Sequence, residues 1–187
     1  MADGSAQQQL QGYLAAQSAK LTAAEIRARL DEAAAGFFAT LEGVTEPAAH
    51  ARPAEGEWSA AEVVDHVTLT LDEVAGIMRA LADGVRPSRP MTVALGPVNG
   101  GRPLAELVGR LRRSQAAVSA FLAARSDGPN TELRVADNYF GEINWKGYAL
   151  ILRLHYKDHA QQVTKTLAAV GSASGEVGYT GVADPVV

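Results

Sequence analysis

Four segments of the chain carry apolar residues at alternating intervals of three and four, the spacing that places side chains on one face of a helix. These segments cover residues 22–43, 59–81, 103–122 and 144–170. In chain order, the inward positions are Ile26, Leu30, Ala33, Phe37 and Leu41; Val63, His66, Val67, Thr70, Val74, Ile77 and Leu81; Leu104, Leu107, Leu111, Val118 and Leu122; and Tyr148, Leu152, His155, His159, Val163 and Thr166. Four amphipathic helices of this length predict an all-α fold, a four-helix bundle.

Polar residues mark the starts of two of these helices. Thr22 and Glu25, and again Ser59 and Glu62, stand three residues apart in the pattern of a capping box. Trp58 comes just before the second box, where its side chain can pack on the helix as a hydrophobic staple. Both helix starts are therefore predicted by a signal that is independent of the apolar pattern.

Three connections separate the four helices. Residues 46–57, 84–103 and 126–142 are rich in Pro, Gly or other turn-forming residues, and we expect loops there, with a short extended piece in the last of them. Pro103 suits the first turn of the third helix. The two longest connections exceed the few residues that usually join antiparallel neighbours. We therefore expect one or two crossover connections that run the length of the bundle.

The bundle is expected to occupy residues 22–171, because Gly171 can end the last helix. Residues 1–21 are rich in Gln and Ala and predict an N-terminal arm or a short extra helix. Residues 172–187 carry few structural signals and predict an irregular C-terminal tail.

Composition and charge restrict the partners and the chemistry. A formal charge of −4 and a pI near 5.6 give no support to binding of nucleic acid or anionic membranes. No window approaches the ~18 uncharged apolar residues of a membrane span, and the N-terminus lacks the pattern of a signal peptide, so we expect a cytoplasmic protein. The chain contains no cysteine, which excludes disulfides, thiolate ligands and a cysteine nucleophile.

The histidines are the candidate chemistry of the chain. His155 and His159 are one helical turn apart on the inward face of the last helix, and His66 lies on the inward face of the second. Three neutral imidazoles in a bundle core suit a divalent metal, with zinc and nickel favoured and iron as an alternative, and leave a position open for water or substrate. The other interpretation is three core histidines, each with its own hydrogen-bond partner. Tyr156 stands where a zinc peptidase would carry glutamate, which disfavours that class, and His50 is expected in a solvated loop.

Four polar residues lie near these histidines in the sequence. Glu62 lies one turn before the histidine of the second helix and Gln162 three residues after the last histidine, so both are candidates to orient a ligand. The capping box already accounts for Glu62. Asp65 and Asp158 adjoin histidines in the sequence but lie elsewhere around their helices, and we expect them to be solvated or salt-bridged.

Two segments together resemble the DinB-like superfamily. "EWSAAEVVDHV" is similar to its W-S/T-x-x-E-x-x-x-H entry, and "YFGEINWKGYALILRLHYKDHAQQV" is similar to its final helix with an H-x-x-x-H pair. The match follows residues 22–171 in order. The resemblance implies a four-helix bundle in an up-up-down-down arrangement, a divalent metal on His66, His155 and His159, and a homodimer. Relatives include thiol-dependent S-transferases and maleylpyruvate isomerases.

Three functional hypotheses follow. The first is a transferase or isomerase that acts on a small-molecule substrate and uses the metal to activate a low-molecular-weight thiol. The second is a hydrolase with a metal-generated hydroxide, for which the sequence offers no clear general base. The third is a non-catalytic metal-binding or stress-associated helical module.

Overall fold

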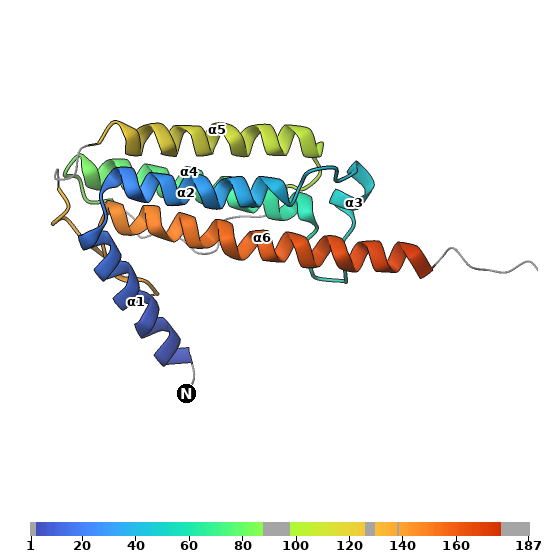
Figure 1. Ribbon diagram of the computed structural model, residues 1–187, viewed down its shortest axis with the longest axis horizontal. Coiled ribbons are helices and arrows are strands. Elements are labelled where there is room, and N and C mark those ends of the chain that lie inside the picture. Colours follow the sequence, from blue (N-terminus) through green and yellow to red (C-terminus); the bar gives the residue numbers. More distant parts are fainter. Residues whose placement is uncertain (1–2, 88–97, 126–129, 138, 177–187) are drawn as a thin grey trace, which may run out of the picture.

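The structure is a computed structural model that describes residues 3–87, 98–125, 130–137 and 139–176 of the chain (Figure 1). Six helices and one small hairpin make up this part of the protein. In order they are α1 (Asp3–Lys20), α2 (Ala23–Ala39), α3 (Glu46–His50), α4 (Ala60–Ala82), α5 (Leu104–Ala123), β1 (Val135–Asp137), β2 (Gly141–Ile143) and α6 (Trp145–Glu176). Among these described helices, none has both the length and the apolar character needed to cross a membrane.

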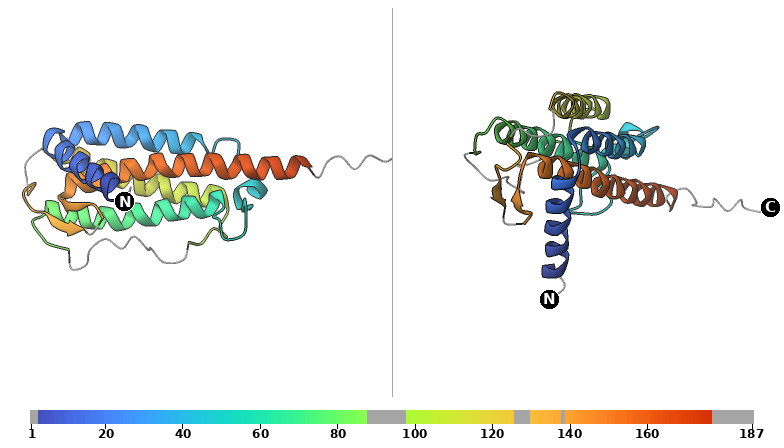
Figure 2. Two further views of the ribbon diagram at one scale, coloured as in Figure 1. Left: turned by 90° about the horizontal axis from the view of Figure 1, so that it is seen from below. Right: turned by 60° about the vertical axis from the view of Figure 1, so that its left-hand side comes forward.

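Helices α2, α4, α5 and α6 form the predicted four-helix bundle (Figures 1 and 2). Around the bundle, α2 packs on α6, α6 on α4, α4 on α5, and α5 on α2. Helices α2 and α6 run in one direction and α4 and α5 in the other. The order is therefore up-down-down-up, and the predicted up-up-down-down order is wrong. The connection from α2 to α4 turns at one end of the bundle, whereas the end of α4 and the start of the parallel helix α5 lie at opposite ends of it.

Both predicted capping boxes are confirmed. The Thr22 hydroxyl accepts from the Glu25 N–H at 3.1 Å, while the Glu25 carboxylate accepts from the Thr22 N–H at 2.8 Å. Ser59 and Glu62 repeat the pattern at the start of α4, with distances of 3.3 and 2.8 Å. Pro103 differs by one position from the prediction, because it is the N-cap of α5 and not part of its first turn.

Two other predicted boundaries are wrong. The expected loop 46–57 contains the short helix α3, whose start is capped by the Thr45 hydroxyl accepting from the Ala48 N–H. Helix α6 does not end at Gly171 but continues to Glu176. Gly171 is helical and is not among the described glycines with positive φ, so it does not form the left-handed turn that ends a helix.

The N-terminal helix lies outside the bundle. Figures 1 and 2 show α1 leaving the bundle at an angle, and it contacts both α6 and the hairpin. Gln7 and Gln11 both donate to the carbonyl oxygen of Tyr139, at 3.0 and 2.9 Å, and Arg153 donates to the Tyr13 hydroxyl at 3.1 Å. The expected extra helix and the short extended piece are both present, the latter as the antiparallel pair β1 and β2.

Helix α6 is central, as its nearly continuous apolar sequence predicts. Its residues Trp145, Tyr148, Leu152 and Tyr156 have 0 or 1% of their surface exposed. The Tyr156 ring packs on Phe37 of α2, with ring centroids 5.6 Å apart. Because α6 touches α2, α4, α1, α3 and β2, polar side chains on its inward faces are held between rigid neighbours.

Candidate metal centre

Three histidines from two helices meet inside the bundle. Their possible ligand nitrogens all lie within 4.8 Å of one another. The ring centroids of His155 and His159 are 4.2 Å apart, and those of His66 are 5.1 Å from the first and 4.9 Å from the second. The structure therefore brings together the three residues that the sequence predicted to face inward, which we call the histidine cluster.

Helix geometry explains how the cluster forms. His155 and His159 are four residues apart on α6, so their side chains project from adjacent turns of the same face. His66 reaches them from the antiparallel helix α4, seven residues after its N-cap, Ser59. The imidazoles thus rest on two packed helices and not on mobile loops, and rigid elements of this kind hold ligands in place.

Burial keeps the imidazoles uncharged. It lowers the pKa of His155 to about 3 and that of His66 to about 4, with a further lowering from the neighbouring imidazoles of the cluster. The pKa of His159 is also lowered by burial, partly opposed by its hydrogen bond to Gln162. All three side chains are therefore neutral near pH 7, which is the form that coordinates metals.

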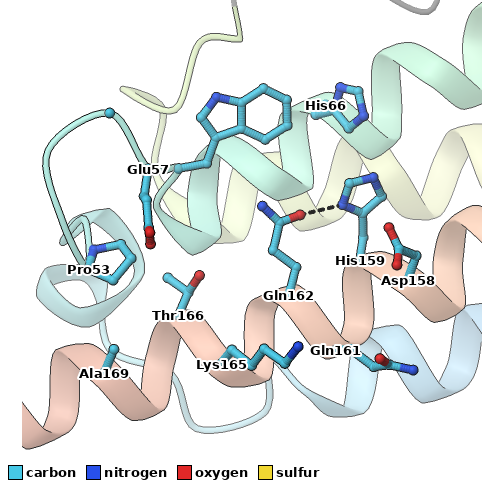
Figure 3. Close-up of a pocket in the computed structure, with 12 residues that line it drawn as sticks. Pro53, Glu57, His66, Asp158, His159, Gln161, Gln162, Lys165, Thr166 and Ala169 are labelled. Atoms are coloured by element: carbon cyan, nitrogen blue, oxygen red, sulfur yellow. Dashed lines mark hydrogen bonds between the residues drawn. The ribbon is translucent and has the colours of Figure 1, made fainter. Parts of the chain in front are cut away.

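One hydrogen bond orients the His159 ring of the cluster. The Gln162 Oε1 atom lies 2.6 Å from His159 Nδ1, so Nδ1 carries the proton and Nε2 keeps its lone pair (Figure 3). The Nε2 atom of His155 is buried and has no hydrogen-bond partner in the described part of the chain. An unpaired buried nitrogen beside two other imidazoles is costly unless something binds it. A three-nitrogen donor set with this geometry fits zinc, nickel or iron(II).

A pocket of about 840 Å³ opens onto the cluster. His66 and His159 lie at its inner end, and one wall is formed by α6 and the other by the segment before α4 (Figure 3). Its lining residues are Pro53, Gly56, Glu57, Trp58, His66, Asp158, His159, Gln161, Gln162, Lys165, Thr166 and Ala169. The candidate metal position therefore has a path to solvent wide enough for a small molecule.

Trp58 lines the pocket, a role that the sequence did not indicate. Its indole ring lies 4.8 Å, centroid to centroid, from the imidazole of His66. The staple pattern predicts that Trp58 packs on α4, but it does not predict that one edge of the ring faces a pocket. Trp58 lies outside α4, directly before its N-cap, so helical spacing gives no signal for its contact with His66.

The other candidate residues lie as follows. The Glu62 carboxylate forms an ion pair with Arg52 and accepts a hydrogen bond from the Ser59 N–H, so its observed contacts are those of an ion pair and a helix cap. Asp65 is paired with Arg110 at 3.0 Å, as expected, whereas Asp158 is exposed but lines the pocket. His50 is at the end of α3, 3.0 Å from Glu46, and does not belong to the cluster.

Comparison with known proteins agrees with this architecture. The crystal structure of TT2238, a four-helix bundle protein, aligns with 77% of this chain and 99% of its own, at 23% identity and a TM-score of 0.58, a likeness of fold. No curated protein matches the chain significantly. The family model of the DinB superfamily matches residues 29–163, a range that contains all three histidines. Since that match spans well over half of the sequence, the chain belongs to the DinB superfamily.

Proposed function

We propose that the protein binds one divalent metal through His66, His155 and His159 and uses it to activate a low-molecular-weight thiol, as a transferase or isomerase. The observation that carries the proposal is the buried and unpaired Nε2 of His155 beside two other neutral imidazoles. A cluster of core histidines without a metal would be expected to give each buried nitrogen its own partner.

The residues around the cluster have distinct tasks in this proposal. Gln162 accepts from His159 Nδ1 and so fixes both the tautomer and the ring orientation of a ligand. Trp58 covers the cluster on the α4 side and excludes water from part of the inner pocket. The pocket itself leaves room for a thiol and for a second, electrophilic molecule.

The nucleophile would come from outside the chain, because the protein has no cysteine. A divalent metal lowers the pKa of a thiol bound to it and so yields a thiolate near neutral pH. In the transfer, the sulfur forms a bond to an electrophilic carbon, the bond from that carbon to its leaving group breaks, and the thiol proton passes to solvent. The neutral imidazoles leave the net charge of the metal undiminished, which favours the thiolate.

The proposal is tested by conjugation of thiols to monochlorobimane, a reaction that forms a carbon–sulfur bond and releases chloride. Zinc- or nickel-loaded protein is expected to accelerate conjugation of at least one bacterial thiol. His159→Ala should abolish the acceleration, whereas His50→Ala, which removes the histidine outside the cluster, should preserve it. Circular dichroism of both variants checks that they are folded. Equal rates for wild type and His159→Ala with every thiol would contradict the proposal.

A further inference from the structure

The pocket is an elongated groove and not a round cavity. It extends along α6 from Asp158 to Ala169, and the segment from Pro53 to Trp58 forms the facing wall (Figure 3). His159 and Thr166 are seven residues apart, which is roughly 10 Å along a helix axis. A ligand with one end at the histidine cluster can therefore place its other end some distance away, between Glu57 and Thr166.

The facing wall carries an arrangement suited to a cation. Glu57 and Trp58 are adjacent in the chain and both line the groove, but the indole points toward His66 at the inner end, whereas the carboxylate lies in the outer half (Figure 3). In Figure 3 the Glu57 carboxylate points across the groove toward Thr166. No ion pair joins Glu57 to any described residue. An unpaired carboxylate on the wall of a groove attracts ammonium groups by charge.

The remaining charges of the groove do not cancel this preference. Its lining has two carboxylates, those of Glu57 and Asp158, and one ammonium, that of Lys165, which leaves one net negative charge. Lys165 extends along α6 toward Gln161 and so away from Glu57 (Figure 3). A ligand that reaches the outer half of the groove therefore meets the carboxylate of Glu57 without a neighbouring cation to offset it.

We infer that Glu57 determines ligand specificity by selecting thiols that carry a protonated amine at the end remote from sulfur. This inference rests on the proposed function, because it assigns the sulfur end of the ligand to the histidine cluster. Thiols of the same length that end in a carboxylate are disfavoured by repulsion from Glu57, and those that end in a hydroxyl are intermediate.

The test uses cobalt(II)-loaded protein, in which a bound thiolate gives a charge-transfer absorption band. Aminohexanethiol, mercaptohexanol and mercaptohexanoate are titrated in turn, since their common chain length can span the groove. We expect the amine to bind about tenfold more tightly than the carboxylate, because Glu57 attracts the one and repels the other across an exposed contact. Glu57→Gln should reduce this ratio to about twofold or less, while the control Glu55→Gln, at an exposed neighbour outside the groove lining, should keep it.

The outcomes separate the inference from the function beneath it. Equal binding of amine and carboxylate in the wild type, a preference for the carboxylate, or a ratio unchanged in Glu57→Gln would overturn the role of Glu57 while leaving thiol binding intact. Absence of a cobalt–thiolate band with all three thiols would contradict the proposed function itself, and the inference with it.

Discussion

Two groups of polar side chains lie inside the same bundle, and they are built in opposite ways. The histidine cluster joins α4 to α6. The second group, which we call the Asp31 cluster, consists of Asp31 on α2 and Gln115 and Ser119 on α5, with Tyr156 of α6 beside them. Asp31 accepts from Gln115 at 2.9 Å and from Ser119 at 3.0 Å, so both oxygens of its carboxylate are matched by donors of the chain, whereas Gln115 Oε1 and the Tyr156 hydroxyl have no partner among the described residues.

The histidine cluster has no such match. Its three imidazoles are bases that face one another, and the Nε2 of His155 finds no donor among the described residues. It also opens to a pocket, whereas no residue of the Asp31 cluster lines one of the described pockets. The Asp31 carboxylate ties α2 to α5 through hydrogen bonds within the chain, whereas the proposed partner of the histidine cluster is a metal ion from outside it.

Metal removal should distinguish the two clusters most strongly. A ligand bound at a concentration far above its Kd stabilises a fold by about 4 kcal/mol, which for a chain of this size is roughly 10 °C in Tm. We expect EDTA to lower the Tm of purified wild-type protein by that amount, measured by calorimetry. Asp31→Ala should respond to EDTA as the wild type does. A response to EDTA in His155→Ala as large as that of the wild type would argue against the assignment.

Acid should destabilise the metal-free protein through the histidine cluster. The unfolded chain takes up protons on histidine near pH 6.5, whereas the folded protein does so only near pH 4 at His66 and near pH 3 at His155. The unfolded state therefore binds more protons below pH 6.5, and stability falls as the pH drops from there toward 3. We expect the Tm of metal-free protein to decrease by several degrees between about pH 7 and pH 4.

A matched variant assigns the acid effect to the cluster. His155→Gln removes one titrating imidazole and should flatten this dependence, while His50→Ala should keep it, since His50 lies outside the cluster. Identical pH profiles for wild type and His155→Gln would show that the loss of stability comes from other groups.

Disruption of the Asp31 cluster should cost stability but leave metal binding intact. Asp31→Ala removes the acceptor of two hydrogen bonds and leaves the donors of Gln115 and Ser119 unpaired in a largely buried position. We expect a loss of about 2 kcal/mol in the free energy of unfolding, measured by urea titration. The metal content of the folded variant should equal that of the wild type, and a parallel loss of metal would break the proposed division between the clusters.

Removal of one hydroxyl from the Asp31 cluster should have the smallest effect. The hydroxyl of Tyr156 is buried without a hydrogen-bond partner among the described residues, and burial raises its pKa. Tyr156→Phe deletes that unpaired group and keeps the ring packed on Phe37. We expect the free energy of unfolding to stay within about 1 kcal/mol of the wild type or to rise. A loss well above this would show that the hydroxyl has a partner, such as a buried water.

Much of the bundle was predictable because its signals are local. Reciprocal capping at Thr22 and Ser59 and the apolar intervals depend only on nearby residues, and they identified four helices correctly. The order of helix directions depends on how the connections pack at the ends of the bundle, and the sequence pattern does not encode this. Helix α3 was missed although Thr45 followed two residues later by Pro47 is a start signal, because a single turn carries no apolar period.

The two clusters also differed in how far the sequence predicted them. The histidine cluster was predictable because all three imidazoles fall on apolar faces, and the spacing of two of them is that of one helical turn. The Asp31 cluster was overlooked, although Gln115 interrupts the inward row between Leu111 and Val118 of α5 and so signalled a buried polar group. Glu57 and Trp58 were not predicted to line a pocket. Their segment faces α6 only in the folded chain, and no local sequence pattern signals that contact.

We expect the histidine cluster to hold a metal, and elemental analysis of the purified protein decides whether it does. We predict about one zinc, nickel or iron per chain in the wild type and in Tyr156→Phe, and almost none in His155→Ala that is folded by circular dichroism. Wild-type protein that neither contains metal nor takes it up on addition of these ions would contradict the claim, as would a His155→Ala variant that retains the full amount.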